Sequence, residues 1–153
     1  MVRIYGVTTK PSTGGTNTGS GNVPSLALSG ITLSSSSTPL TTDGRGVETE
    51  STIIIIPANK VALFTIQIVA NTEVTPHKAA SWIVSGMAKR DTDASSVSIL
   101  GISPVSSIGD DEMENTKIEL SENISFGGIS IRCYGVFNYT SIKWAATVTL
   151  TEV

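Results

Sequence analysis

The sequence has a single cysteine, a single histidine and few charged side chains. Cys133 alone excludes an intrachain disulfide framework and any zinc site built from several cysteines. Only 15% of the residues are charged, and 13 acidic residues face 10 basic ones, for a net charge of −3. A nucleic-acid-binding chain needs Lys and Arg to displace counterions from phosphates, so we predict no nucleic-acid partner.

Long apolar runs are also missing. The longest, Ile53–Ile56, ends at Pro57 and is far shorter than the ~18 residues that a membrane-spanning helix needs. The N-terminal residues lack the ~7–15-residue apolar core of a secretory signal. We therefore predict no membrane partner and no secretion signal.

What the chain has in place of charge is serine and threonine, which together make up roughly a quarter of it, well above their average share. Hydrophobic residues still account for 39% of the 153 residues. Disorder throughout needs low hydrophobicity and high net charge, and this chain has neither. The composition and length favour one globular domain.

From residue 51 onward the hydrophobic pattern repeats every two residues, which is typical of half-buried strands. The segment 141–153 is the clearest example, with inward positions predicted at Ile142, Trp144, Ala146, Val148 and Leu150. Segments 61–70 and 81–89 alternate in the same way, whereas 110–116 is long enough only for one helical turn. Seven or eight short strands with frequent turns predict an all-β, jelly-roll-like β-sandwich over residues 51–153.

Residues 1–50 have a different composition. The stretch 10–24 is rich in Gly, Ser, Thr and Asn, has one charge, and contains little that could be buried. We predict that 1–50 is an extended arm that lies across a neighbouring subunit; packing along the side of its own domain is the alternative. The residues expected to make the assembly contacts are Arg3, Tyr5, Leu26, Leu28, Ile31 and Leu33.

The sequence offers little catalytic chemistry. His77 follows Pro76 in a loop, and no Gly-x-Ser-x-Gly elbow is present to pair with it, so a solvated histidine is favoured over a catalytic base. Cys133 falls on the apolar face of a strand, where a buried inert thiol is expected. No Gly-rich segment opens a helix as a phosphate cradle would. We predict that the chain is not an enzyme and holds no cofactor or metal.

The carboxylates gather at Asp91 and Asp93 and again within 110–114. Solvated turn residues are the favoured interpretation. Two weaker alternatives are a paired-carboxylate site for polysaccharide hydrolysis and a calcium site formed by flexible acidic loops.

The aromatic residues suggest one contact patch. Trp82 and Trp144 lie on apolar-alternating faces and are predicted to be core residues rather than sugar-stacking platforms. The candidate contact patch is the tip of a predicted hairpin, which carries Tyr134, Phe137, Asn138 and Tyr139.

Several segments together resemble a β-domain that recurs in virion proteins of tailed bacteriophages. They are Ile142-Lys-Trp-Ala-Ala-Thr-Val-Thr-Leu-Thr-Glu-Val153, Ala80-Ser-Trp-Ile-Val-Ser-Gly-Met-Ala-Lys-Arg-Asp91, Val97-Ser-Ile-Leu-Gly101 and Ile129-Ser-Ile-Arg-Cys-Tyr-Gly135. The resemblance spans about residues 52–153 and implies a structural role in the virion, with no cofactor.

Two roles follow from this resemblance. The first is a capsid decoration, or cement, protein that bridges neighbouring subunits through its N-terminal arm and binds the major capsid protein. The alternative is a small tail-fibre or baseplate component with a receptor- or glycan-binding tip. In either case we expect a homotrimer, because homo-oligomers usually have closed symmetry and virion appendages are often three-fold.

Overall fold

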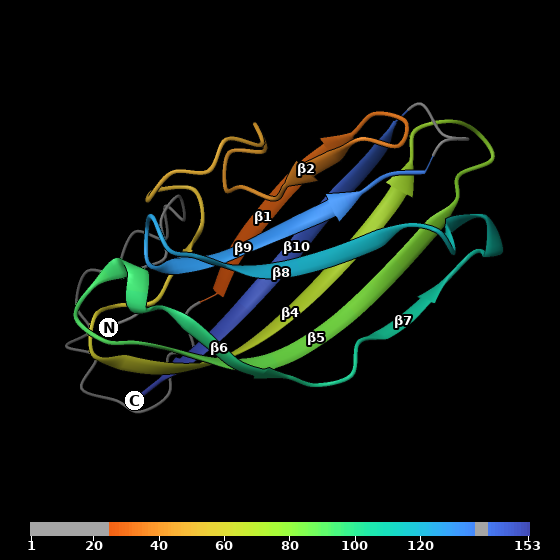
Figure 1. The fold of residues 1–153 in the computed structure, drawn as a ribbon. Coiled ribbons are helices and arrows are strands. Elements are labelled where there is room, and N and C mark those ends of the chain that lie inside the picture. The colour runs from red at the N-terminus through yellow and green to blue at the C-terminus, as the bar shows by residue number, and fades with distance from the viewer. Residues whose placement is uncertain (1–24, 137–140) are drawn as a thin grey trace, which may run out of the picture.

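The computed structural model describes residues 25–136 and 141–153, and these form two antiparallel β-sheets packed face to face (Figure 1). The strands are β1 (Ser25–Thr32), β2 (Ser37–Pro39), β3 (Ile54–Ile55), β4 (Lys60–Thr72), β5 (Ala79–Arg90), β6 (Ser98–Ile102), β7 (Ser106–Gly109), β8 (Lys117–Asn123), β9 (Gly128–Tyr134) and β10 (Ile142–Glu152). Two single turns of 3-10 helix, η1 (Ala94–Ser96) and η2 (Asp111–Met113), complete the described elements. The predicted all-β sandwich is confirmed.

The larger sheet has six strands in the order β1-β10-β4-β5-β6, with β7 also paired to β5. Strand β10, the last in the chain, therefore lies between β1 and β4 near the middle of the sheet (Figure 1). Strands β6 and β7 share one edge of β5, because β6 pairs with its C-terminal half and β7 with its N-terminal half. The smaller sheet has the order β2-β9-β3, with β8 also paired to β9.

The predicted alternation along the long strands is confirmed. All five inward positions expected in segment 141–153 are buried, as are the expected apolar positions of β4. Trp82 and Trp144 are core residues, as predicted, and their rings stack with centroids 5.3 Å apart. Burying two large aromatic rings in contact stabilises the sheet beyond the area that they remove from water.

Seven or eight strands were predicted over residues 51–153, and the structure has eight there, β3 to β10. The other two of the ten described strands, β1 and β2, lie within 25–50, which was predicted to be an arm. The run Ile53–Ile56 is buried as expected, but only Ile54 and Ile55 pair with β9. The one helical turn expected within 110–116 is η2.

The predicted boundary between arm and sandwich at residue 50 is wrong for residues 25–50. Strand β1 pairs with β10 along its whole length, and β2 pairs with β9. Leu26 and Leu28, expected to be assembly residues, are 0% and 3% exposed and belong to the core. For this segment the alternative, packing along its own domain, is the correct one. Residues 1–24, with Arg3 and Tyr5, lie outside the described residues.

Candidate interaction surface

The six-stranded sheet has one face in the core and one face in solvent. In its four long strands the even-numbered residues point inward and the odd-numbered ones outward, as the burial patterns of β1, β4, β5 and β10 show. We call the solvent side the outer face; it consists of the odd-numbered residues of 25–31, 61–71, 79–89 and 143–151. Ile108 and Ser106 of β7 extend it, because they pair with outward residues of β5.

The outer face carries almost no charge. Among its residues only Lys143 and Lys89 are charged, and the strand register places them at opposite ends, against Asn71 and Val61. The rungs between them contain Ser, Thr, Ala, Gln and aliphatic side chains. One such rung, which crosses the whole sheet, runs Ser29, Ala145, Val69, Ser81 and Ile108.

Aliphatic side chains stand out from this face. Ile31, Val69 and Ile83 are each about half exposed, at 49%, 50% and 49%, and Ile108 is 77% exposed. Single exposed aliphatic residues are common on any protein, but several on one uncharged sheet face form a patch of the kind used for contact. Hydroxyl groups on neighbouring strands of this face form hydrogen bonds with each other, such as the one between Thr65 Oγ1 and Ser85 Oγ at 3.3 Å.

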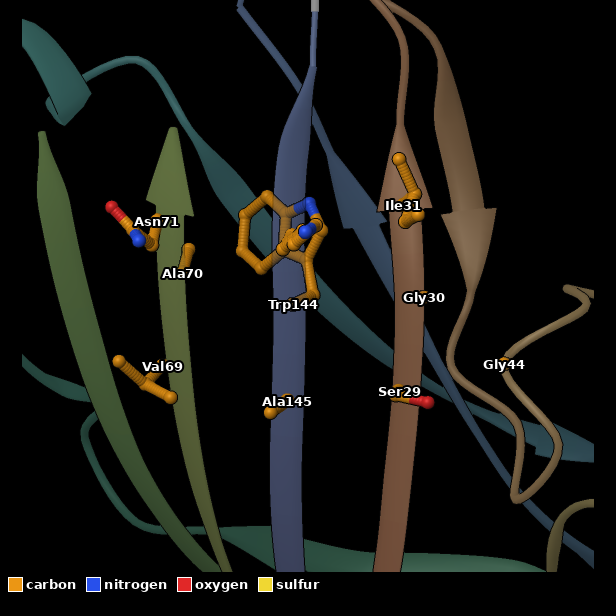
Figure 2. A pocket seen from close by; sticks show the side chains of 10 residues that line it. Ser29, Gly30, Ile31, Gly44, Val69, Ala70, Asn71, Trp144 and Ala145 are labelled. Atoms are coloured by element: carbon orange, nitrogen blue, oxygen red, sulfur yellow. The ribbon is translucent and has the colours of Figure 1, made fainter. Parts of the chain in front are cut away.

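Two shallow hollows lie on the outer face, on either side of the β10–β4 strand pair. One, of about 460 Å³, is bordered by Ser29, Ile31 and Val69, and the other, of about 390 Å³, by Val69, Ile83 and Thr147. Both include Ala145, whose methyl group leaves a low point between longer neighbours. Figure 2 shows Ala145 on β10, with Val69 on β4 to one side and Ser29 on β1 to the other.

A cluster of charged and polar side chains borders one end of the outer face. Lys143 Nζ lies 2.8 Å from Glu73 Oε1, and the Ser141 hydroxyl donates a hydrogen bond to the same carboxylate. The Lys143 ammonium, and then the Ser141 hydroxyl, hold the pKa of Glu73 below its usual value. The charge of Lys143 is thereby paired with Glu73 at the end of the outer face, where Lys143 also borders the 460 Å³ hollow.

The smaller sheet presents a different surface. On β8 and β9, Lys117 Nζ lies 3.5 Å from Glu119 Oε2, and the Tyr134 hydroxyl lies 3.2 Å from the same oxygen. Arg132 donates to the Ser37 hydroxyl at 3.2 Å. This side of the sandwich is therefore polar and charged, in contrast to the outer face.

The predicted aromatic contact patch lies only partly within the described residues. Phe137, Asn138 and Tyr139 lie outside them. Tyr134 is half-buried, and Lys117 Nζ lies 4.7 Å from its ring centroid. A lysine over the ring occupies one aromatic face by a cation–π contact, which leaves less of the ring for stacking on a ligand.

Two of the predicted assembly residues are accessible. Ile31 is part of the outer face, and Leu33, just beyond β1, is 63% exposed. Their role in assembly stays a prediction, and the strand that carries Ile31 belongs to the sandwich.

The two acidic clusters lie far apart. Asp91 directly follows the C-terminal end of β5, whereas Asp110 lies beside its N-terminal end, where its carboxylate accepts a hydrogen bond from the Ala79 amide at 2.8 Å. The twelve residues of β5 span roughly 40 Å at ~3.4 Å per residue. Glycoside hydrolysis needs two carboxyl groups about 5–10 Å apart, so the two clusters cannot form one such site together.

Within the second cluster two carboxylates, those of Asp110 and Glu112, bind protein groups. Glu112 forms an ion pair with Lys78 at 2.8 Å, and this contact holds its pKa below the usual value. Across residues 25–136 and 141–153, no group of three or more His, Cys, Asp and Glu side chains is placed to hold a metal ion.

His77 and Cys133 have ordinary structural surroundings. His77 is exposed, and its Nδ1 lies 2.7 Å from the carbonyl oxygen of Thr72. Cys133 is 0% exposed, and burial raises the pKa of its thiol, as expected for an inert core cysteine. No helix in the described part of the chain is both long enough and apolar enough to cross a membrane.

Sequence reasoning did not identify the outer face as a surface. The signal for it was present in the outward positions Ala145, Thr147, Thr149 and Thr151, which carry no charge. What the pattern could not supply is the strand order, which sets these residues beside Val69 and Ile83.

No family model and no curated protein matches the chain. Among solved structures, the chain is similar to the tailspike protein of Acinetobacter baumannii phage AM24, with a TM-score of 0.39 and 8% sequence identity. The match covers 78% of this chain and 26% of the tailspike, so the chain spans about a quarter of that protein's length. A likeness at this identity and TM-score does not establish a shared function.

Proposed function

We propose that the chain is a structural component of a bacteriophage virion, a fibre-like or baseplate subunit of the tail that acts through its sheet surfaces and not through catalysis. The observation that carries this proposal is the uncharged outer face. Soluble proteins that stay apart from partners keep charges of both signs spread over their surface, whereas this face has four successive rungs without a charged side chain. Such a face suits permanent packing in an assembly.

The fold favours the tail role over capsid decoration. A decoration protein of the kind expected from the sequence would bridge capsid subunits with a 50-residue arm. Residues 25–50 instead supply β1, β2 and buried core side chains to the sandwich, so this part of the predicted arm is not available for a bridge. A tail subunit needs no long arm, because its contacts can be made by the faces of the sandwich.

The number of copies on the particle tests this proposal. We expect purified particles of the encoding phage to contain the chain in tens of copies or fewer, measured by quantitative mass spectrometry against the major capsid protein. Antibody labelling seen by electron microscopy should lie at the tail. Hundreds of copies spread over the head would support capsid decoration instead, and absence of the chain from purified particles would overturn a virion role altogether.

A host-cell adsorption assay tests whether the chain has the receptor- or glycan-binding tip expected of a tail-fibre component. If the chain is a receptor-binding tail component, the purified protein adsorbs to host cells and competes with phage adsorption. A purified chain that labels the tail but does not adsorb is a structural subunit without a receptor site.

A further inference from the structure

We propose that the outer face is the surface through which copies of this chain associate, with the face of one copy packed on the same face of another. The inference rests on the proposed structural role and names the contact by which it is carried out. The occupant is a second copy of this chain, and three properties of the face support that choice: its charge, its relief and its area.

The charge distribution suits a self-contact. In a contact between two identical faces, any charge near the centre meets a like charge of the other copy or loses its hydration without a partner. The outer face has no charge at its centre; Lys143 and Lys89 stand at its two ends, and Lys143 is already paired with Glu73. The opposite side of the sandwich, with Lys117, Glu119 and Arg132, does not meet this condition.

The relief of the outer face, meaning its projecting side chains and its hollows, also suits a contact with an identical face. Val69 and Ile83 project from it, and the low points beside Ala145 form hollows of about 460 and 390 Å³ next to them. Projections and hollows on the same patch are what an isologous contact requires, because each copy supplies both partners of every contact. The aliphatic side chains of one copy can thus fill the hollows of the other.

The area is sufficient for a stable oligomer. Five strand positions at ~4.8 Å and about eight residues at ~3.4 Å each give a face of roughly 24 Å by 27 Å, or roughly 650 Å² per copy. Two such faces bury roughly 1,300 Å² in total, within the ~1,200–2,000 Å² typical of specific, stable interfaces. A small crystal-type contact would be well below this range.

The test is the oligomeric state of the full chain and of two charge variants. Size-exclusion chromatography with light scattering is run on the wild type, on Ala145→Glu at the centre of the outer face, and on the control Ser121→Glu. Ser121 is an exposed position on β8, in the other sheet, so its variant adds the same charge away from the proposed contact. Circular dichroism and thermal melting confirm that each variant is folded.

We expect the wild type and Ser121→Glu to be oligomers, and Ala145→Glu to raise the dissociation constant for self-association at least ~100-fold, since like charges brought together in an interface cost several kcal/mol. If Ala145→Glu does not fold, Ile83→Lys, which replaces a half-exposed side chain on β5, takes its place. A wild type that stays monomeric at ~100 μM, where even a weak specific interface is populated, overturns the inference. So does a folded Ala145→Glu that still associates like the wild type.

The two proposals fail separately. A monomeric chain that is nevertheless found in the tail in few copies would leave the proposed function standing and would point to another virion protein on the outer face. An oligomeric chain that is absent from purified particles would support the contact through the outer face and would overturn the proposed role in the virion.

Discussion

The indole N–H of Trp144 donates a hydrogen bond to the Thr32 hydroxyl at 2.9 Å, and both residues are buried. Trp144 is on β10 and Thr32 on β1, so the bond links the strand near the middle of the sheet to the strand at its edge, over and above their backbone pairing. It also satisfies the one polar atom of a ring that is otherwise buried among apolar side chains.

Replacing Thr32 with valine tests this link. The substitution keeps the shape of the side chain but removes the acceptor, so the buried indole N–H loses its partner. We expect the free energy of unfolding to fall by about 1–3 kcal/mol, measured by urea denaturation. Thr32→Ser, which keeps the hydroxyl, is the matched control and should recover most of the hydrogen-bond contribution.

A second variant separates the hydrogen bond from the packing. In the Trp144→Phe background no indole N–H is present, and Thr32→Val should then cost much less than in the wild type. Equal costs in the two backgrounds would show that the hydrogen bond contributes nothing.

Gly86 occupies a position where the core leaves no space. It lies directly opposite Phe64 on β4, and a Cβ added there would be 2.4 Å from Phe64 Cζ and 2.7 Å from the Gly101 carbonyl oxygen. We expect Gly86→Ala to destabilise the protein by about 1–3 kcal/mol, because overpacking displaces a buried ring.

Gly101→Ala is the control for this prediction. A Cβ added at Gly101, in the neighbouring strand β6, would have no heavy atom within 4 Å, so its effect on the unfolding free energy should be within about 0.5 kcal/mol. Thermal and urea unfolding measure the stabilities of Gly86→Ala and Gly101→Ala relative to the wild type. Equal stabilities would mean that Phe64 moves aside at no cost.

The inner faces of the long strands were predictable from the sequence because a strand has a fixed period of two. Val148 and Leu150 follow from Trp144 by counting, and the prediction holds wherever a strand is long enough to count along. The buried state of Cys133 followed in the same way.

The place of β1 was not predictable by the same means. Leu26 and Leu28 alternate with small residues, but the Gly- and Ser-rich stretch before them made the whole region look like an arm. Which strand a segment pairs with depends on contacts across more than 100 residues of chain, and no local pattern encodes that choice. For the same reason the outer face could be recognised only from the strand register, which places Ala145 beside Val69.

The Glu73–Lys143 contact predicts a small pH dependence of stability. Because the pKa of Glu73 is lower in the folded protein than its ordinary value of 4.5, this carboxylate contributes stability at neutral pH. That contribution is full above about pH 4.5 and is lost as the pH falls through the folded pKa. We expect the wild type to melt at a higher temperature than Glu73→Gln at pH 7, and the gap to close at acidic pH.

Calorimetry across this pH range measures the gap. The contact is exposed, so added salt at pH 7 should shrink the gap as well. A gap that stays constant from neutral to strongly acidic pH would mean that the charge of Glu73 is not its source.

The buried thiol of Cys133 predicts slow chemical modification. Because burial raises its pKa and excludes reagents, we expect no measurable reaction with a thiol reagent such as DTNB in the native protein and one equivalent after unfolding in guanidinium. Rapid labelling of the native protein would contradict the position of Cys133 on the inner side of β9.

Leu26 and Leu33 form a matched pair for the last prediction, because the same substitution removes the same atoms from a buried and an exposed site. Leu26 is 0% exposed within β1, and Leu33 is 63% exposed just beyond that strand. If residues 25–33 were an arm reaching another subunit, neither Leu26→Ala nor Leu33→Ala would change the stability of an isolated sandwich. As part of the core, Leu26→Ala should lower the free energy of unfolding by about 2–5 kcal/mol, whereas Leu33→Ala should stay within about 0.5 kcal/mol. Urea denaturation at low protein concentration keeps any effect on self-association out of the comparison, and equal stabilities would place β1 outside the sandwich.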